Sequence, residues 1–429
     1  MAKLPPGPGL APEQVAAHQL ARIRGATIEI VGERGYRALK VRDLVRSAGV
    51  STRAFYEHFD SKEDCFLRTY ELISGRATRR IIAAQADERD WRERPRLVFE
   101  EFVHQLEDDP NGARMALVEA YTAGPEPLEQ AWRAERTFEG MLAESFARAP
   151  GVVVPPLVIE GMVAGVARVA RTRLLAKRVT KLEELSDELV GWLLTYPNEA
   201  AGGLAELDGQ SVWRNTMLEP LPGSTASGDG EAWPSAGDRA LILTAVAKLA
   251  VADVYANLTP SRIRAEASVP RSKLNSYFDG VEDCFLAALE QKAAEAFAQA
   301  ARAQTAGRSW AGGVYRAIVA LCEYIAGDQF LASVCLADDF PPGSRGARTR
   351  QRLIAAVAEQ LGDGAPRDAR PSALVTEATA GAVWAVFHHH AIRDWAQRRE
   401  IAATLSYLAL APAVGAGAAI TAIRSEQTG

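Results

Sequence analysis

Cysteine is scarce in this chain, and the few cysteines present do not form a motif. The 429 residues include four cysteines and no Cys-x-x-Cys pair, so the sequence offers neither a disulfide framework nor a zinc site. Cys65 and Cys284 each stand directly before a Phe-Leu pair. A free cysteine among apolar neighbours usually packs as a small hydrophobic side chain. We therefore expect both to be buried rather than redox-active.

Positive charge is not in excess either. The formal net charge is −5, with 24% charged and 48% hydrophobic residues, which is ordinary for a globular protein. This balance excludes a protein that coats nucleic acid through its overall charge. A DNA-binding protein of this composition has to gather its positive charge on a local surface.

Catalytic and metal-binding signatures are also lacking. The sequence shows no nucleophile–base pair, phosphate-binding loop or metal cluster, so we expect neither an enzyme nor a cofactor. His388-His389-His390 are consecutive and point about 100° apart on a helix, so they cannot converge on one ion. His390 and Asp394 could share an ion, but two ligands are a weak metal signal.

The sequence also lacks a clear membrane-spanning or targeting segment. Residues 401–423 carry no charge, and ~20 apolar residues would cross a bilayer. Pro412, Gly415 and Gly417 interrupt the run, which favours a buried helix. Residues 1–12 are rich in Pro and Gly and do not resemble a signal peptide. We expect a disordered arm over 1–13, no membrane contact and a cytoplasmic location.

What the chain does contain is a repeat. Residues 48–67 (AGVSTRAFYEHFDSKEDCFL) align without a gap on residues 267–286 (ASVPRSKLNSYFDGVEDCFL), with nine of 20 positions identical. Such repetition decides how the whole fold is interpreted. Because the two copies lie about half a chain apart, the repeat indicates a duplicated domain and not a solenoid.

Around the first copy the pattern predicts short helices. Residues 14–34 have the spacing of one amphipathic helix, which Gly32 and Gly35 are placed to end. A second helix is expected over about 41–48, followed by a tight turn at Gly49. Ser51 is a suitable N-cap for a third helix over 52–59. Its inward residues are Phe55 and Phe59, which leaves Thr52, Arg53 and Tyr56 outward.

This stretch resembles the DNA-binding domain of the TetR family of repressors over about residues 18–70. The motifs that carry the resemblance are the Gly-Tyr-x-x-Leu step at 35–39, Ala-Gly-Val-Ser at 48–51, Phe-Tyr-x-x-Phe at 55–59 and Lys-Glu-Asp at 62–64. The resemblance implies that the third helix enters the major groove. Residues 18–68 hold ten Lys and Arg against seven Asp and Glu, a local positive surface.

Family positions suggest which side chains meet DNA. The resemblance makes Arg42, Thr52 and Arg53 candidates for base edges, and makes Tyr56, His58 and Lys62 candidates for phosphates or the groove wall. The chemistry suits these roles. Arg can bind guanine through two hydrogen bonds, and a tyrosine hydroxyl or a lysine can grip the backbone.

The second copy keeps the core positions and changes the outward ones. Arg42 becomes Ser261, beside Arg262, and Thr52-Arg53-Ala54 becomes Arg271-Ser272-Lys273. Asn275 replaces Tyr56 and Val281 replaces Lys62, while basic and acidic residues balance at six each over 238–287. The candidates for DNA contact in this copy are Arg262, Arg271, Ser272, Lys273 and Asn275. Whether this copy contacts DNA or serves as a degenerate dimerisation surrogate stays open.

The remaining residues are predicted to form helical effector domains. In the first copy, breaks are expected near 109, 124 and 149, with two last helices over 155–178 and 181–196. The resemblance implies that these two pair with a partner's in a four-helix bundle, through Leu182, Leu185, Leu189, Trp192 and Leu193. It also implies an effector cavity within 97–148, although the aromatic residues there are more often plain core: Phe99, Phe102, Met115, Tyr121, Trp132, Phe138 and Phe146.

These observations predict an all-α chain with two TetR-like units. The expected segments are 14–70 and 71–200 for the first helix-turn-helix and effector domain, 201–237 for a linker rich in Gly and Ser, and 238–289 and 290–424 for the second pair. We expect a ligand-responsive repressor that binds an asymmetric double-stranded DNA operator as a single-chain pseudo-dimer. Its unknown small-molecule effector is expected to be apolar or aromatic. The alternative is a regulator that dimerises further and reads DNA through its first helix-turn-helix, with the second unit as sensor or scaffold.

Overall fold

The computed structural model describes residues 11–121, 123–176, 185–204, 207, 237–253, 255–336, 344–367, 370–393 and 401–428. In these residues the secondary structure is helical, and the one extended pairing is an isolated bridge between Val153 and Asn198. The prediction of an all-α chain is confirmed for this range. The chain divides into two compact units, Met1–Pro150 with Val166–Leu194, and Gly151–Gly165 with Thr195–Gly429.

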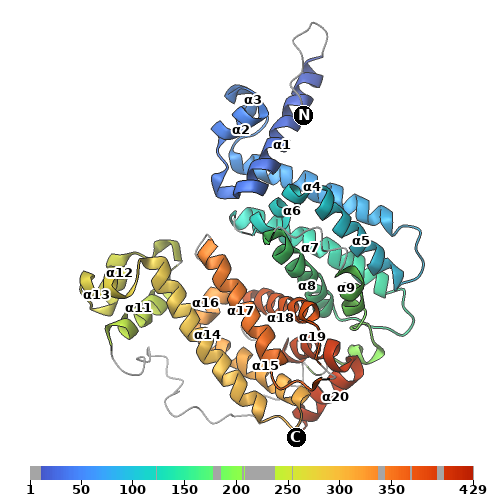
Figure 1. Cartoon of the computed structure of the whole chain (residues 1–429), viewed down its shortest axis with the longest axis vertical. Coiled ribbons are helices and arrows are strands. Elements are labelled where there is room, and N and C mark those ends of the chain that lie inside the picture. The colour runs from blue at the N-terminus through green and yellow to red at the C-terminus, as the bar shows by residue number, and fades with distance from the viewer. Residues whose placement is uncertain are drawn as a thin grey trace. The chain divides into compact units, whose positions relative to one another are not determined.

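Unit 1 opens with the first helix-turn-helix. Its elements are α1 (Pro12–Arg34), the 3-10 turn η1 (Tyr36–Ala38), α2 (Val41–Ala48), α3 (Thr52–Tyr56) and the long α4 (Lys62–Ala84) (Figure 1). The face of α1 that the spacing predicted to be apolar is buried, with Ile23, Ile30 and Val31 in the core. Ser61 caps α4 by accepting a hydrogen bond from the Asp64 N–H at 3.0 Å.

Gly32 does not end α1, contrary to our expectation. The helix runs on to Arg34, and Gly35 (φ +83°) ends it by donating its N–H to the Val31 carbonyl at 2.9 Å. Gly32 instead lies inside the helix where α6 passes close by. A Cβ at this position would lie 2.6 Å from Cα of Asn111, so only glycine allows this approach.

The rest of unit 1 consists of α5 (Glu93–Asp108), α6 (Pro110–Arg114), the π-helical turn η2 (Met115–Glu119), α7 (Pro125–Phe146), part of α8 (Pro156–Leu175) and α9 (Ser186–Leu193). The predicted breaks near 109, 124 and 149 are present. A further break at 85–92 was not predicted. The expected break at Val179-Thr180 and the side chain of Leu182 lie outside the described residues.

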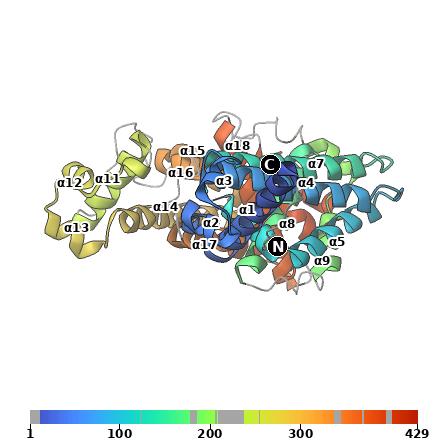
Figure 2. The same cartoon turned by 90° about the horizontal axis from the view of Figure 1, so that it is seen from above.

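Unit 2 contains the second helix-turn-helix and the C-terminal helices. Its elements are η5 (Glu199–Gly203), α11 (Asp238–Ala252), η7 (Tyr255–Asn257), α12 (Pro260–Ala267), α13 (Arg271–Tyr277), α14 (Val281–Thr305), α15 (Trp310–Gly327), α16 (Gln329–Leu336), α17 (Ser344–Gly362), α18 (Ala373–Arg393), α19 (Ala402–Val414) and α20 (Ala416–Gln427). Helices α11, α12 and α13 gather round the N-terminal end of α14 (Figure 2).

Local structure repeats in the register of the gapless alignment. Tyr36 and Tyr255, which pair when that alignment is extended, each pack edge-on against a phenylalanine, Phe66 or Phe285, with ring centroids 5.0 Å apart in both cases. The repetition extends beyond the helix-turn-helix. The side chain of Asp109 accepts from the Gly112 N–H at 2.9 Å, and its counterpart in the same register, Asp328, accepts from the Leu331 N–H at 2.9 Å.

Part of the core of unit 2 comes from the first half of the chain. The rings of Tyr196 and Tyr407 lie 6.0 Å apart. The Tyr407 hydroxyl donates to the Tyr196 carbonyl at 2.6 Å, and the Tyr196 hydroxyl donates to the Leu408 carbonyl at 3.1 Å. At the start of α8, a Cβ on Gly161 would lie 2.8 Å from Leu408 Cδ1. Residues from both sides of the expected linker therefore pack in one unit.

The uncharged run at 401–423 is buried, as its interruptions suggested. Residues Ala402–Ala411 of α19 are all buried, and Gly415 (φ +82°) separates α19 from α20. Within the part of the chain that the structure describes, no helix has the length and apolar character needed to cross a membrane.

Several expectations fall on residues that lie outside the description. These are most of the arm (1–10), most of the linker (205–206 and 208–236), Asp394, and the side chains of His389 and His390. His388 is buried in α18. Among the described residues, no group of three or more possible metal ligands occurs.

Candidate DNA-binding surface

The turn between α2 and α3 has the geometry that a helix-turn-helix needs. Gly49 adopts a left-handed conformation (φ +59°, ψ +39°) and donates its N–H to the Arg46 carbonyl at 3.2 Å. The Val50 N–H then returns to the Val45 carbonyl at 3.0 Å. Together these bonds close the end of α2 and turn the chain sharply. Ser51 caps the next helix by accepting from the Ala54 N–H at 3.1 Å.

Helix α3 has an inner and an outer face. Phe55 is buried, as is Phe59 beyond its end, and their ring centroids lie 5.7 Å apart. On the outer face the Arg53 side chain is 89% exposed and Tyr56 is 55% exposed. Thr52 is exposed as well. The helix was predicted to reach Phe59 but ends at Tyr56, because the backbone turns through Glu57 and His58.

The two outward arginines have acidic neighbours. Arg53 Nε lies 3.0 Å from Glu57 Oε1, and Arg42 Nε lies 3.7 Å from Asp43 Oδ1. Both arginines are exposed, and exposed ion pairs contribute only about 0–1 kcal/mol. A phosphate or a guanine edge can therefore take over either guanidinium at small cost.

Lys62 and His58 form contacts within the protein that their family positions do not imply. The Lys62 ammonium donates to the Leu39 carbonyl at 3.3 Å and lies 4.9 Å from the Tyr36 ring centroid. The His58 carbonyl accepts from Arg68 at 2.7 Å, while its ring Nε2 is buried without a hydrogen-bond partner. The Lys62 side chain and the His58 backbone therefore support the fold of the turn. The candidates of this copy that are exposed are Arg42, Thr52, Arg53 and Tyr56.

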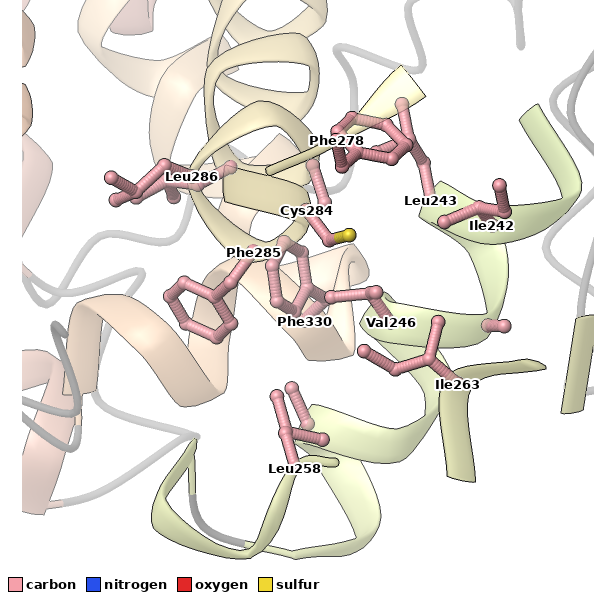
Figure 3. Close-up of a cluster of buried hydrophobic side chains, with 14 of the residues drawn as sticks. Ile242, Leu243, Val246, Leu258, Ile263, Phe278, Cys284, Phe285, Leu286 and Phe330 are labelled. Atoms are coloured by element: carbon pink, nitrogen blue, oxygen red, sulfur yellow. The ribbon is translucent and has the colours of Figure 1, made fainter. Parts of the chain in front are cut away.

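The second helix-turn-helix repeats the turn with a residue other than glycine. Ser268 takes the left-handed conformation (φ +54°, ψ +38°), donates its N–H to the Ala265 carbonyl at 3.3 Å, and is followed by the Val269 N–H to Arg264 carbonyl bond at 3.1 Å. Leu274 and Phe278 are buried at the positions of Phe55 and Phe59. The core around Ile242, Cys284 and Phe285 closes beneath them (Figure 3).

Two of the five candidates in the second copy are held by acidic side chains. Lys273 Nζ lies 2.7 Å from Asp238 Oδ2, and this hydrogen bond raises the pKa of Lys273. Arg262 donates to Asp253 Oδ2 and to the Asn257 carbonyl, both at 2.9 Å. Arg271, Ser272 and Asn275 are exposed on α13.

Sequence reasoning missed one residue on this surface. Tyr277, at the last position of α13, is 44% exposed. It occupies the position of His58 in the alignment of the two copies. An exposed tyrosine can bind a phosphate through its hydroxyl, so it offers a substitute for the tyrosine that Asn275 replaces. The sequence contained a signal for Tyr277, because the alignment pairs it with the candidate residue His58. Our prediction for the second copy considered other positions of the family pattern.

Neither Cys65 nor Cys284 is accessible to reagents in the solvent. Burial raises the pKa of the Cys65 thiol to about 11 and that of Cys284 to about 12. Both side chains are fully buried. The expectation that they pack as small hydrophobic residues is confirmed.

A second feature of functional interest is an apolar cavity in unit 2. It lies among α14, α15, α16, α17, α18 and α19 and has a volume of about 80 Å³, where one water needs about 10–15 Å³ in the same measure. Its walls include Leu289, Ala293, Leu321, Trp384 and Leu405. In unit 1 the hollow between α4 and α7 is an open groove with a polar lining that includes Glu71, Arg79 and Gln130.

Comparison with known proteins agrees with the geometry of the first copy. The family model described as "Bacterial regulatory proteins, tetR family" matches residues 23–69. Residues 23–69 are therefore similar to proteins of that family. The match covers α1 from Ile23 through the first turns of α4. The TetR family consists of transcription regulators and not of enzymes.

Longer matches to known transcriptional regulators are partial. The HTH-type transcriptional activator FasR of Mycolicibacterium smegmatis is 30% identical over 110 residues, which are 24% of this chain and 48% of FasR. The chain thus spans about half the length of this curated relative. Among solved structures, the fatty acid degradation regulator FadR from Bacillus halodurans is 18% identical and has a TM-score of 0.38, with 41% of this chain and 97% of FadR covered. FadR from Bacillus subtilis, solved with stearoyl-CoA, is 20% identical and has a TM-score of 0.37, with 40% and 96% covered.

Proposed function

We propose that the chain is a ligand-responsive transcriptional regulator in which two TetR-like units, joined in one polypeptide, bind DNA as a pseudo-dimer. The observation that carries the proposal is the repeated turn. Gly49 and Ser268, which occupy the same position in the alignment of the two copies, share the left-handed conformation and the same two closing hydrogen bonds. A serine in that conformation is strained, so its retention points to a turn that the fold requires.

The pairing of the two copies is supported by the core of unit 2. Tyr196 and Gly161 come from the first copy, and Tyr407 and Leu408 come from the second. In TetR-like proteins the last two helices of one subunit pair with those of another. The contacts around Tyr196 and Tyr407 lie where such a pairing would fall within one chain.

Because the two proposed reading helices expose different side chains, the two half-sites of the operator should differ in sequence. Identical readers in a dimer require a palindrome with half-sites about 34–36 Å apart. Here the exposed set is Thr52, Arg53 and Tyr56 on α3, but Arg271, Ser272 and Asn275 on α13. We therefore expect an asymmetric operator, or one strong and one weak half-site. Equal protection of both arms of a strict palindrome by one monomeric chain would contradict this expectation.

The cavity of unit 2 supports a response to an apolar effector. Leu331 of α16 lines the cavity, and its neighbour Phe330 packs against Phe285 in the core of the second helix-turn-helix, with ring centroids 5.7 Å apart (Figure 3). A ligand that shifts α16 would shift Phe330 and therefore the packing beneath α13. Effector and operator would then oppose each other by a reciprocal coupling free energy.

The proposal can be tested by selecting bound DNA from a random library. The wild-type chain would be compared with Arg53→Ala and Arg271→Ala, with Arg302→Ala on α14 as a matched exchange away from both reading helices. We expect each reading-helix variant to lose about 1–3 kcal/mol of binding free energy and to relax the selected sequence on one arm. If neither variant changes affinity or sequence, the assignment of α3 and α13 as readers is wrong.

A second architecture is favoured by the ion pairs of the second copy. Because Lys273 and Arg262 are already held by Asp238 and Asp253, this copy has fewer side chains ready for phosphates. In that case the chain would dimerise further and read DNA through its first copy alone. The mass in solution, measured with and without operator, separates the two: one chain per operator supports the pseudo-dimer, and two chains support the alternative.

A further inference from the structure

We propose that the chain has one effector site, in unit 2, which takes an alkyl chain, and that the equivalent position in unit 1 is closed by phenylalanines. This inference deepens the proposed function and rests on its equivalence between the two copies. It assigns effector sensing to the second of the two copies.

The walls of the unit 2 cavity define the class of ligand. They are apolar side chains except for Gln360, whose amide donates to Gln304 Oε1 at 2.5 Å. A charged or strongly polar group placed there would lose its hydration without gaining a partner. An alkyl chain has no such cost, and its burial among Leu289, Ile318 and Leu353 is favourable.

The two effector domains can be compared position by position because their register is marked by polar contacts. On α7, Gln130 donates to Glu71 Oε1 of α4 at 3.0 Å. The counterparts of these two residues in the alignment register also meet, since Thr349 of α17 contacts Glu290 Oε1 of α14 at 3.5 Å. The helix pairs α4–α7 and α14–α17 therefore pack in matching register.

In this register, three aliphatic residues of the cavity become aromatic in unit 1. Ile318, Leu321 and Val357 correspond to Phe99, Phe102 and Phe138. The three rings pack on one another, with centroids 6.4 Å apart between Phe99 and Phe102 and 6.3 Å apart between Phe102 and Phe138. Their larger side chains occupy the space that the smaller residues leave in unit 2.

The two units also differ in polarity at the outer part of the same site. Leu289 and Ala293 of the cavity correspond to Tyr70 and Ser74, which line the open groove of unit 1. At this groove Gln130 is 9% exposed, and its Oε1 has no hydrogen-bond partner. An alkyl chain laid over this surface would cover the exposed Glu71 and Arg79, which line the same groove, and would remove their water without replacing its hydrogen bonds. Unit 1 therefore disfavours the ligand that unit 2 accepts.

Calorimetric titration of the full chain tests the proposal, with dodecanoic acid and stearoyl-CoA as separate probes. We expect one ligand per chain, with affinity falling roughly 15-fold for each two methylenes removed from the fatty acid. Tight binding of the free acid identifies the alkyl chain as sufficient. Binding of the thioester alone still supports the site and assigns its source. Failure of both probes, or two equal sites per chain, would overturn the proposal.

Matched substitutions locate the site. Ala293→Phe places a ring in the cavity and should weaken binding by about 10-fold or more, whereas Ser74→Phe, at the equivalent position of unit 1, should leave it unchanged. The paired change Phe102→Leu with Phe138→Val should open a second site and raise the stoichiometry toward two. Thermal unfolding checks that each variant is folded. An unaltered affinity in folded Ala293→Phe would contradict the assignment.

Operator binding without ligand separates this inference from the proposed function. The affinity of Ala293→Phe for operator should no longer change when the alkyl probe is added, whereas that of the wild type should. A wild-type chain that binds the probe once but binds no DNA would refute the regulator and leave the site intact. A chain that binds DNA but takes two probes would do the reverse.

Discussion

Ser268 occupies a backbone region that L-residues other than glycine seldom adopt. Among the residues that the structure describes, it is the one non-glycine residue with a positive φ. The left-handed conformation costs about 1–2 kcal/mol for a residue with a Cβ, and part of the gain from relieving it is lost to the greater freedom of glycine in the unfolded chain. We predict that Ser268→Gly raises the free energy of unfolding by about 0.5–1 kcal/mol, measured by chemical denaturation.

The first copy supplies the reciprocal experiment. Gly49 has φ +59°, and a Cβ there would lie 2.2 Å from Arg22 Nη2, so Gly49→Ala should lower stability by about 1 kcal/mol. Gly25, inside α1 with open space around it, serves as control, since Gly25→Ala should stabilise the helix by about 0.5–1 kcal/mol. A destabilised Ser268→Gly variant would show that the hydroxyl, and not the backbone, determines this turn.

At the scale of single residues, helical spacing predicted which side chains of the α3 region are buried and which are exposed. The inward Phe55 and Phe59 and the outward Arg53 and Tyr56 follow from spacing alone, and the structure places them so. Spacing could not show that Lys62 reaches back to the Leu39 carbonyl, because that contact joins residues from separate elements. Contact of any of these residues with DNA stays a prediction.

At the scale of elements, helix α20 is anchored by one buried carboxylate. The Glu426 side chain is 1% exposed; it accepts from the Arg308 N–H at 3.0 Å and from Arg316 Nε at 2.5 Å. Burial alone would raise the pKa of Glu426, but these two donors outweigh it and leave the pKa below 4.5. The carboxylate form therefore stabilises the fold.

We predict that Glu426→Gln lowers the free energy of unfolding by about 1.5–3 kcal/mol at neutral pH. Because the folded pKa lies below the ordinary value of 4.5, the contribution is complete above pH 4.5 and is lost as the pH falls through the folded value. The difference between wild type and variant should therefore shrink in acid, followed by denaturation at several pH values. Glu359→Gln, an exposed change on α17, should show no such difference; an equal loss there would refute the anchor.

Sequence patterns were less able to find the limits of elements that depend on neighbours. The glycine spacing suggested that Gly32 ends α1, yet the helix continues because Asn111 of α6 packs against that glycine. The break at 85–92 has no Pro or Gly to announce it. At Gly32 a residue distant in sequence decides the outcome, and at 85–92 the Arg94 side chain donates to the Gln85 and Glu88 carbonyls. Local propensity cannot express either contact.

At the scale of the whole molecule, unit 2 takes segments from both sides of the expected linker. Gln427 donates to the Leu207 carbonyl at 3.0 Å, and Tyr407 donates to the Tyr196 carbonyl at 2.6 Å. We predict that cleavage at a protease site introduced within 221–230 leaves the two pieces associated. Size-exclusion chromatography of the cleaved chain should show one species with the mass of the intact protein.

The same cleaved chain tests how strong this association is. Tyr407→Phe removes the hydrogen bond to Tyr196 and should cost about 0.5–1.5 kcal/mol, so its cleaved form should dissociate at a lower denaturant concentration. Pieces that separate from the wild type without denaturant would contradict the shared core, and with it the pairing on which the pseudo-dimer depends.

The sequence by itself determined the helical class, the repeated segment and the outward faces of α3 and α13, because these follow from the spacing of side chains along a helix and from the matched letters of two segments. Tertiary structure alone decided which equivalent positions enclose a cavity and which are filled. A phenylalanine is predicted as core in either copy, and only the packing of Phe99, Phe102 and Phe138 on one another shows that their space is taken.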